Sequence, residues 1–359
     1  MPKPRFLAPW HQPDVIAMLE SEGLSVEELA ALKGKPANYH CLSRVVDRRF
    51  VLGDEEREQF VAYMRLYERF CGVRVLTFCV MSNHFHILLE VPAPPEERGA
   101  DWSDERLLDH LECLYSKQQM GALRWELVHY REQKNTEAAE AFRERYLRRM
   151  WDLSEFMKTL KQRFTRWFNR HHGRKGTLWE ERFKSVLVED GHAARNMAAY
   201  IDLNPVRAKM VDDPRNYRWC SYAEAVAGKE RSREGLQRVL FEEQSTLTCE
   251  ERAAEMLLSW KKAAARYRKI LYVDLNRHDP NLDPDDAPQL TEAEALRCKV
   301  RYHADGVAIG TKQFINTIFQ MTRSWFGAGR KSGARKLKGI DTPLYCFRDL
   351  QRDAIGPPS

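Results

Sequence analysis

Long hydrophobic runs are missing from this sequence of 359 residues. No apolar stretch approaches the roughly 20 residues that a membrane-spanning helix needs, which argues against a helical membrane protein. The first residues, MPKPRFLAPWHQP, also lack the apolar centre of a secretory signal. We therefore expect a cytoplasmic protein with no membrane partner.

Closely paired cysteines are missing as well. The eight cysteines lie scattered, with no C-x-x-C pair among them. This argues against a zinc ribbon or a disulfide framework and favours reduced thiols, to which we assign no chemistry. With 43% hydrophobic and 31% charged residues, the chain has the composition of a soluble globular protein, long enough for two domains or for one domain with additions.

The net charge of +6 is modest but unevenly distributed. Residues 143–184 hold 13 Lys and Arg against 5 acidic residues, and residues 321–340 hold six basic residues and no acid. Aromatic residues are interleaved in both blocks. Lys and Arg side chains bind phosphate backbones, and aromatic side chains stack on unpaired bases, so nucleic acid is the favoured partner. The alternative is a basic helix face that is only solvated.

The pattern of apolar residues predicts an alternation of strands and helices. A strand over 38–46 precedes a helix over 54–70, a hairpin of strands over 73–81 and 84–91, and a charged helical stretch over 101–150. Asp152 and Glu155 then resemble a capping box that opens an amphipathic helix. A strand over 182–190 follows, and a helix over 192–203 stops at Asn204 and Pro205.

Without the stretch near 101–150, the order is βαββαβ plus a final helix. We expect an α+β fold of the ferredoxin-like type, an antiparallel sheet with helices on one face. The predicted organisation is a discontinuous core of residues 1–92 and 151–225, a helical insertion over 93–150, and a mostly helical C-terminal extension over 226–359 that either contacts DNA or forms a helical cap or dimer surface.

Two histidines open the strand that begins at residue 84. Side chains alternate along a strand, so His84 and His86 share one face, while Phe85 and Ile87 share the apolar one. The pair can hold one cation if a third ligand arrives from elsewhere, or can simply be two half-exposed strand histidines. On the helix over 192–203, Asn196, Tyr200 and Asn204 recur every four residues beside a buried stripe, so that a phenol and a carboxamide project together.

Several ordered motifs together resemble one known family. MSNHFHILLEV, GTLWEERFKSVLVED, AAYIDLNPVRAKMV and YRWCSYAEA are similar to the successive motifs of the REP-associated tyrosine transposases, relatives of the single-tyrosine HUH transposases. The resemblance implies an HUH endonuclease fold, in which His84 and His86 hold a divalent metal and Tyr200 cuts single-stranded DNA. Asn204 takes the place of a third metal ligand. It also implies recognition of short palindromic hairpins, with the N-terminal arm PKPRFLAPW reaching toward the DNA, and it slightly favours a monomer over a dimer.

The chemistry predicted from these residues is metal-dependent cleavage and rejoining of single-stranded DNA. A Mg²⁺ or Mn²⁺ ion relieves the negative charge of the phosphodiester while the tyrosine attacks, which gives a 5′-phosphotyrosine and a free 3′-hydroxyl. The alternatives are a domesticated, non-cleaving DNA- or RNA-binding protein on the same fold, and a hydrolase in which metal-bound water attacks. The residues expected to hold DNA are Arg44, Arg163, Arg166, Arg182, Lys184 and Arg207.

Overall fold

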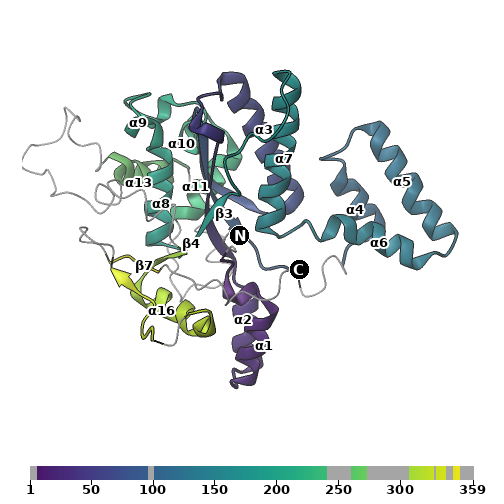
Figure 1. Ribbon diagram of the computed structural model, residues 1–359, viewed down its shortest axis with the longest axis horizontal. Coiled ribbons are helices and arrows are strands. Elements are labelled where there is room, and N and C mark those ends of the chain that lie inside the picture. Colours follow the sequence, from purple (N-terminus) through teal and green to yellow (C-terminus); the bar gives the residue numbers. More distant parts are fainter. Residues whose placement is uncertain are drawn as a thin grey trace, which may run out of the picture.

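The computed structural model describes residues 6–95, 101–240, 260–272, 307–326, 329–336 and 343–347. At its centre lie four strands in the order β2-β3-β1-β4, with antiparallel pairing throughout. The strands are β1 (Ala37–Arg44), β2 (Arg74–Val80), β3 (His84–Val91) and β4 (Lys184–Val188). Along the chain, helix α3 (Asp54–Cys71) comes between β1 and β2, and helix α7 (Leu153–His171) comes between β3 and β4 (Figure 1). The predicted α+β, ferredoxin-like fold is confirmed.

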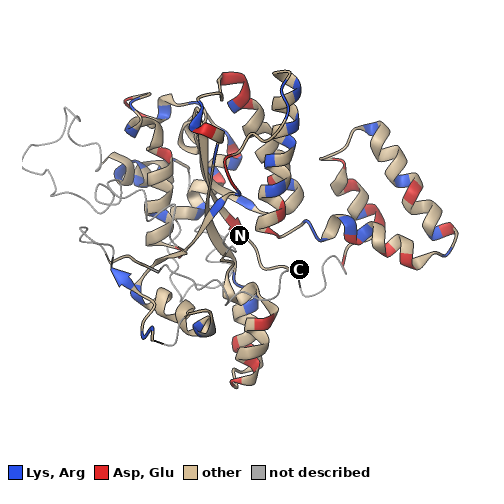
Figure 2. Ribbon diagram, in the orientation of Figure 1, with Lys and Arg blue, Asp and Glu red and all other residues tan. Residues whose placement is uncertain are grey.

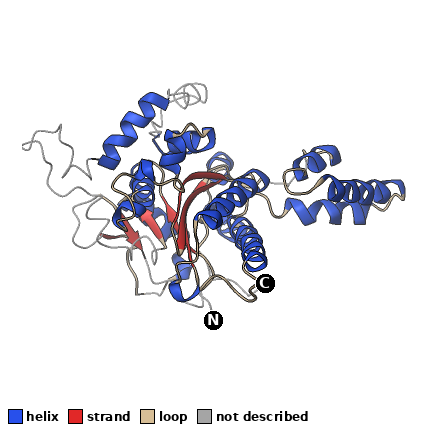
Figure 3. Cartoon of the chain, turned by 90° about the horizontal axis from the view of Figure 1, so that it is seen from above, coloured by secondary structure: helices blue, strands red, loops and turns tan. Residues whose placement is uncertain are grey.

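Helices cover both faces of this sheet, whereas we expected them on one face only. Helices α3 and α7 pack on the side of Phe85, Ile87 and Leu89. The other side, which includes Leu88 and Val186, packs against a second helical layer (Figure 3). That layer consists of α8 (His192–Asp202), α10 (Ser221–Val226), α11 (Glu230–Leu240) and α13 (Trp260–Tyr272). Both faces of β3 and β4 carry apolar side chains, so the sheet requires burial on both sides.

The basic helix α7 buries its aromatic face in the core. The Asp152 side chain accepts a hydrogen bond from the Glu155 backbone nitrogen at 2.8 Å, which starts the helix where the sequence predicts. Its basic residues lie on the outer side (Figure 2), while Phe164 and Phe168 are buried, as are Trp179 and Phe183 further along the chain. These rings therefore do not serve as stacking platforms for bases, contrary to one reading of the sequence.

The insertion forms three helices that project from the body of the molecule (Figures 1 and 3). They are α4 (Asp104–Leu111), α5 (Lys117–Glu132) and α6 (Thr136–Leu147). Their helical character agrees with the sequence prediction. Among the described residues, every helix is too short or too polar to span a membrane.

The C-terminal extension takes part in the central sheet. It is mostly helical where described, as expected, but it also adds strands in the order β4-β5-β7-β6, with β5 parallel to β4. These elements are β5 (Ala308–Gly310), α16 (Lys312–Met321), β6 (Arg335–Lys336) and β7 (Tyr345–Phe347). The predicted helical start at 249–259 and the acidic linker near 276–288 lie outside the described residues.

The N-terminal arm packs against this extension. Phe6 contacts Trp325 edge-on at 5.6 Å between ring centroids, and Trp10 contacts Phe314 at 6.4 Å. Two helices that the sequence analysis did not predict follow the arm, α1 (Pro13–Ser21) and α2 (Val26–Lys33). Trp325 and Phe326 of the second basic block are buried, so they too are core residues and not a base-stacking surface.

A buried carboxylate fixes the end of α8. Asp202 is fully buried and accepts hydrogen bonds from the Thr77 hydroxyl (3.0 Å), the Tyr267 hydroxyl (2.7 Å) and the Tyr222 backbone nitrogen (3.1 Å). Burial raises the pKa of the Asp202 carboxyl to about 6, although these hydrogen bonds favour its ionised form. Three elements, β2, α10 and α13, thus hold the last turn of α8 in place.

Replacing Asp202 with alanine should destabilise the protein strongly. Asp202→Ala leaves the Tyr267 hydroxyl and the Tyr222 amide buried without this acceptor, which we expect to lower the free energy of unfolding by about 3 kcal/mol. Tyr267→Phe removes only one donor and should cost about 1 kcal/mol. Urea denaturation of both variants provides the measurement. Equal losses in the two variants would contradict this role of the carboxylate.

Candidate active site

His84 and His86 open β3 and point toward the layer that contains α8. Phe85 and Ile87, which alternate with them, are fully buried on the opposite side against α3 and α7. His86 is buried at 3% exposure, and His84 is half-buried. Their ring centroids lie 5.0 Å apart, at an interplanar angle of 81°.

In both imidazoles the Nδ1 atom has a partner. His84 donates from Nδ1 to the Asn83 side-chain oxygen at 2.6 Å, and His86 Nδ1 lies 2.9 Å from Nε2 of His40. Burial, followed by the charges of Arg44 and Arg207, lowers the pKa of His84 to about 4. Burial and the neighbouring His84 and His40 hold the pKa of His86 well below its ordinary value. Both rings are therefore neutral at neutral pH, and Nε2 is the nitrogen of each ring that could coordinate a metal.

Tyr200 reaches this pair from α8. Its ring centroid lies 5.7 Å from that of His86, at an interplanar angle of 87°, and 6.1 Å from that of His40. The stripe of Ala193, Met197 and Ile201 is buried as predicted, and it seats the helix on the sheet. Tyr200 is itself buried at 5% exposure, so it is more enclosed than a residue at a helix edge. A phenol from a late helix thus lies beside the paired imidazoles of an early strand.

Asn204 and Arg207 complete the cluster. They belong to α9 (Asn204–Arg207), a single turn that follows α8. The Asn204 side-chain nitrogen donates to the backbone carbonyls of Tyr200 (3.0 Å) and Ile201 (3.3 Å), and its oxygen accepts from Arg207 at 3.0 Å. The guanidinium carbon of Arg207 lies 4.2 Å from the centroid of the Tyr200 ring. Asn204 thus holds the end of α8 through its nitrogen and holds Arg207 through its oxygen. If Asn204 also bound a metal, its oxygen would be shared between the metal and Arg207.

The Nη1 atom of Arg207 is buried without a hydrogen-bond partner. An unsatisfied buried guanidinium nitrogen is costly, and it offers a donor that a water or an anion can take. Since Nη1 belongs to the guanidinium stacked on Tyr200, an oxyanion placed beside this tyrosine would satisfy it. Arg207 is therefore a candidate phosphate ligand within the cluster itself.

His40 on β1 is a part of the site that the sequence analysis missed. It is buried at 1% exposure, and its ring stacks on that of His86 at 5.1 Å and 6°. In the sheet register Leu42 is paired with His86 and His40 with Leu88, so the two histidines are diagonal neighbours on one face. His40 is visible in the sequence as the histidine of NYHCLSRVV. Its place beside His86 follows only when the pairing register of β1 with β3 is known.

The residues predicted to hold DNA do not lie in one place. Arg44 is paired with His84 across the sheet, and Lys184 shares the row of His86 and Leu42, so both lie on the face of the imidazole pair. Arg166 and Arg182 instead line a groove of about 710 Å³ between α7 and residues 177–183, together with Lys158 and Lys161. Arg163 lies over the Tyr63 ring at 5.5 Å.

Within the part of the chain that the structure describes, no acidic side chain stands beside His84 and His86 as a third metal ligand. Among the described residues, the His, Cys, Asp and Glu atoms within 4.8 Å of one another that could share an ion belong to a different group, Glu56, His171 and His172. An ion on His84 and His86 would thus complete its coordination with a carboxamide, water or a phosphate oxygen. Open positions of this kind are typical of a catalytic site.

Comparison with known proteins identifies one domain. Residues 35–96, which include β1, α3, β2 and β3, match the family described as "Transposase IS200 like". This stretch includes His40, His84 and His86 and does not extend to Tyr200. A solved REP-associated tyrosine transposase bound to a REP hairpin is similar at 14% identity with a TM-score of 0.34, over 59% of this chain and 89% of that chain. A search among curated proteins finds no match.

Proposed function

We propose, from the premise that residues 35–96 form an IS200-like transposase domain, that this protein cleaves and rejoins single-stranded DNA with Tyr200 as nucleophile. The match confirms the predicted resemblance to single-tyrosine transposases, the superfamily that includes the REP-associated group. The observation that carries the finer proposal is the contact between rings. Tyr200 lies against His86, whose Nδ1 atom is occupied and whose Nε2 atom is available for coordination.

The proposed step exchanges one phosphoester bond for another. The Tyr200 oxygen loses its proton and attacks phosphorus, the bond to the 3′-oxygen breaks, and that oxygen leaves as a hydroxyl after taking up a proton. A divalent ion held by His84 and His86, Mg²⁺ or Mn²⁺, would supply charge neutralisation at the phosphate. Because the product stores the energy of the broken bond in a phosphotyrosine, a 3′-hydroxyl can reverse the reaction and rejoin DNA.

Three cationic side chains suit the phosphate backbone near the reaction. Arg207 lies over the nucleophile with an unsatisfied nitrogen, and Arg44 and Lys184 lie on the same sheet face. We assign Arg207 to the scissile phosphate, and Arg44 and Lys184 to neighbouring phosphates. Arg166 and Arg182, in the groove beside α7, are assigned to a more distant part of the same DNA.

End-labelled DNA tests the proposed chemistry. We suggest incubating the protein with Mn²⁺ and a pool of single-stranded hairpins whose flanking bases are randomised, labelled at either the 5′ or the 3′ end. The 3′ label should remain attached to denatured protein, and the 5′ label should leave on a shortened strand with a free 3′-hydroxyl. The strands recovered with the protein would also give the target sequence.

Other outcomes select other functions. Cleavage with both labels released from the protein would indicate attack by water, as in a metal-dependent hydrolase. Salt-sensitive binding without any cleavage in Mn²⁺ or Mg²⁺ would indicate a domesticated DNA- or RNA-binding protein on the same fold. Either result would reject Tyr200 as the nucleophile.

His40 should control how well His86 holds a metal. Partners that hydrogen-bond to the second nitrogen of a ligating histidine fix its tautomer, and their loss typically weakens metal binding by about 10- to 100-fold. We expect this loss of Mn²⁺ affinity in His40→Leu, measured by calorimetry without DNA. His40→Gln retains a side chain that can hydrogen-bond to His86, so its loss should be smaller. Wild-type affinity in His40→Leu would show that the 2.9 Å contact is not needed for orientation.

A further inference from the structure

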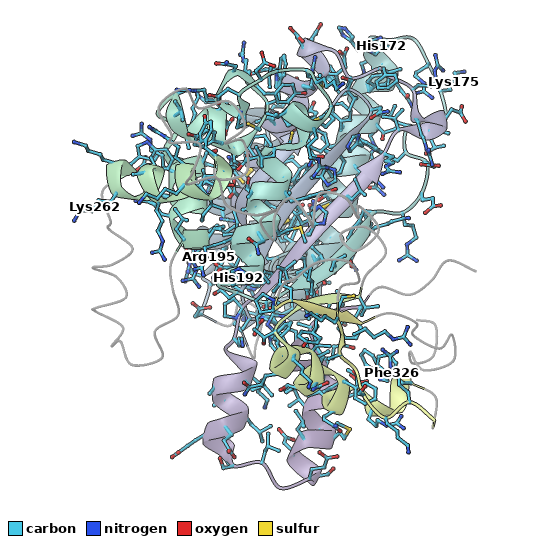
Figure 4. All side chains as sticks on the ribbon, turned by 90° about the vertical axis from the view of Figure 1, so that its left-hand side faces the viewer. His172, Lys175, His192, Arg195, Lys262 and Phe326 are labelled. Carbon is cyan, nitrogen blue, oxygen red and sulfur yellow. The ribbon has the colours of Figure 1, made fainter. Side chains whose placement is uncertain are left out.

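A second group of metal-ligand side chains lies where the end of α7 meets the start of α3. Glu56 comes from the first turn of α3, while His171 is the last residue of α7 and His172 follows it. One ligand atom of each lies within 4.8 Å of the others. Helices α3 and α7 cover the sheet face opposite to α8, so this group is separate from His84 and His86. In Figure 4, His172 lies near Lys175 at the end of the molecule far from His192.

The carboxylate of this group is held rigidly. Glu56 is buried, and its Oε2 atom accepts a hydrogen bond from the Gly53 backbone nitrogen at 2.8 Å, as the cap of α3. Its Oε1 atom lies 2.9 Å from Nε2 of His172. With Oε2 held by the helix cap, Oε1 faces the imidazole, where it and Nε2 of His172 could both bind one ion.

The two imidazoles are accessible to an ion from solvent. The side chains of His171 and His172 are 41% and 38% exposed, and their ring centroids lie 4.9 Å apart. Nε2 of His171 also lies 3.4 Å from Glu55, whose side chain is 65% exposed. A fourth ligand, an oxygen of Glu55, is thus within reach of the same position.

We propose that Glu56, His171 and His172 bind a Zn²⁺ ion at this junction. Two imidazoles and a carboxylate form a common ligand set for Zn²⁺, and tetrahedral coordination at about 2.0 to 2.1 Å places ligand atoms about 3.4 Å apart. Oε1 of Glu56 and Nε2 of His172 lie 2.9 Å apart, and the three ligand atoms lie within 4.8 Å of one another. Small side-chain movements would bring them to the tetrahedral spacing. The half-exposed histidines make such adjustments without disturbing the core.

The ion would tie the ends of two helices to a basic loop. Arg174 and Lys175 follow the histidines directly, and the loop is already linked to α7 by the hydrogen bond from Asn169 to the Gly176 carbonyl at 2.8 Å. Bound Zn²⁺ takes the place of the hydrogen bond between His172 and Glu56 and joins α3 to α7. It therefore stabilises this end of the molecule and orders the two cations beside the proposed DNA-binding side.

Zinc titration of the full-length protein in a background without the catalytic pair tests the proposal. The variant His84→Ala/His86→Ala should bind one Zn²⁺ in calorimetry, and addition of the ion should raise its melting temperature. Adding His171→Ala and His172→Ala should weaken this binding by at least about 100-fold and remove the thermal shift. His192→Ala in the same background is the matched control and should bind as tightly as the parent.

Glu56→Gln separates coordination from folding. A glutamine oxygen can still accept from the Gly53 nitrogen, so α3 keeps its cap, while the anionic ligand is lost. We expect at least about 10-fold weaker Zn²⁺ binding with an unchanged melting temperature in the absence of the ion. If the His84→Ala/His86→Ala protein binds no Zn²⁺, or binds it equally after loss of both His171 and His172, the site does not exist. Neither result bears on DNA cleavage by the wild-type protein.

Discussion

Tyr200→Phe should abolish the covalent protein–DNA adduct completely while leaving DNA binding intact. The substitution removes only the phenolic oxygen that forms the new phosphoester, and without it no bond to phosphorus can form. The ring remains between His86 and Arg207, so the site should stay folded and should still bind Mn²⁺. Denaturing gels of 3′-labelled DNA give the measurement, together with affinity by gel shift.

A tyrosine in the projecting insertion provides the matched control. Tyr130 lies on α5, and its hydroxyl donates to Glu126 at 3.4 Å, away from the histidine pair. Tyr130→Phe should form the adduct at the wild-type rate. An adduct that persists in Tyr200→Phe and is lost in another tyrosine variant would move the nucleophile elsewhere, and hydrolysis persisting in Tyr200→Phe would indicate attack by water.

The core of the fold could be predicted because its signals are local. The alternation around Phe85 and Ile87, the cap at Asp152, and the break at Pro205 each depend on neighbouring residues. These signals gave β1 to β4, α3, α7 and α8 nearly at their observed bounds. That α10, α11 and α13 join α8 in a second helical layer was missed, since the apolar positions on both faces of β3 show that a cover is needed and do not show which distant segments supply it.

The site was only partly predictable because it depends on register and on helix rotation. His84 and His86 stand out as a short motif, and Tyr200 as a member of a row on one helix face. The role of His40 depends on its contact with His86, 46 positions away on another strand. The stacking of Arg207 on Tyr200 depends on how the short helix α9 is placed after α8. Local sequence patterns do not specify either placement. The group of Glu56, His171 and His172 was missed for the same reason, since Glu56 and His172, which are in contact, lie 116 positions apart in the sequence.

The basic residues over 143–184 could be recognised from the sequence, but the burial of the aromatic residues among them could not. The excess of basic residues over 143–184 was visible in the sequence, and the outer side of α7 carries it (Figure 2). Most of the aromatic residues among them, including Phe164 and Phe168, proved to be core, because a helix that faces solvent with its cations buries its rings on the other side. Residues that alternate in the sequence are thus separated in space. If α7 binds DNA as proposed, we expect its cations to contribute more than stacking.

Arg207→Ala should slow cleavage by about 100- to 1000-fold at saturating DNA, the loss typical of removing one preorganised donor to developing negative charge. Arg207 has an unsatisfied nitrogen next to the nucleophile, and its guanidinium also orients the Tyr200 ring. Single-turnover kinetics of adduct formation measure the effect. Arg207→Lys retains the charge and loses the planar fork, so it should recover only part of the rate.

Two further measurements separate this role from simple DNA affinity and from damage to the fold. Arg166→Ala, on the outer side of α7, should weaken binding and reduce its salt dependence by about one counterion, with little change of rate at saturation. The charge of Arg207 lowers the pKa of His84 and His86, so it also repels a cation held there. Without DNA, Arg207→Ala should therefore bind Mn²⁺ as tightly as the wild type or more tightly. Weaker Mn²⁺ binding with an unchanged cleavage rate would place Arg207 in support of the fold and not at the phosphate.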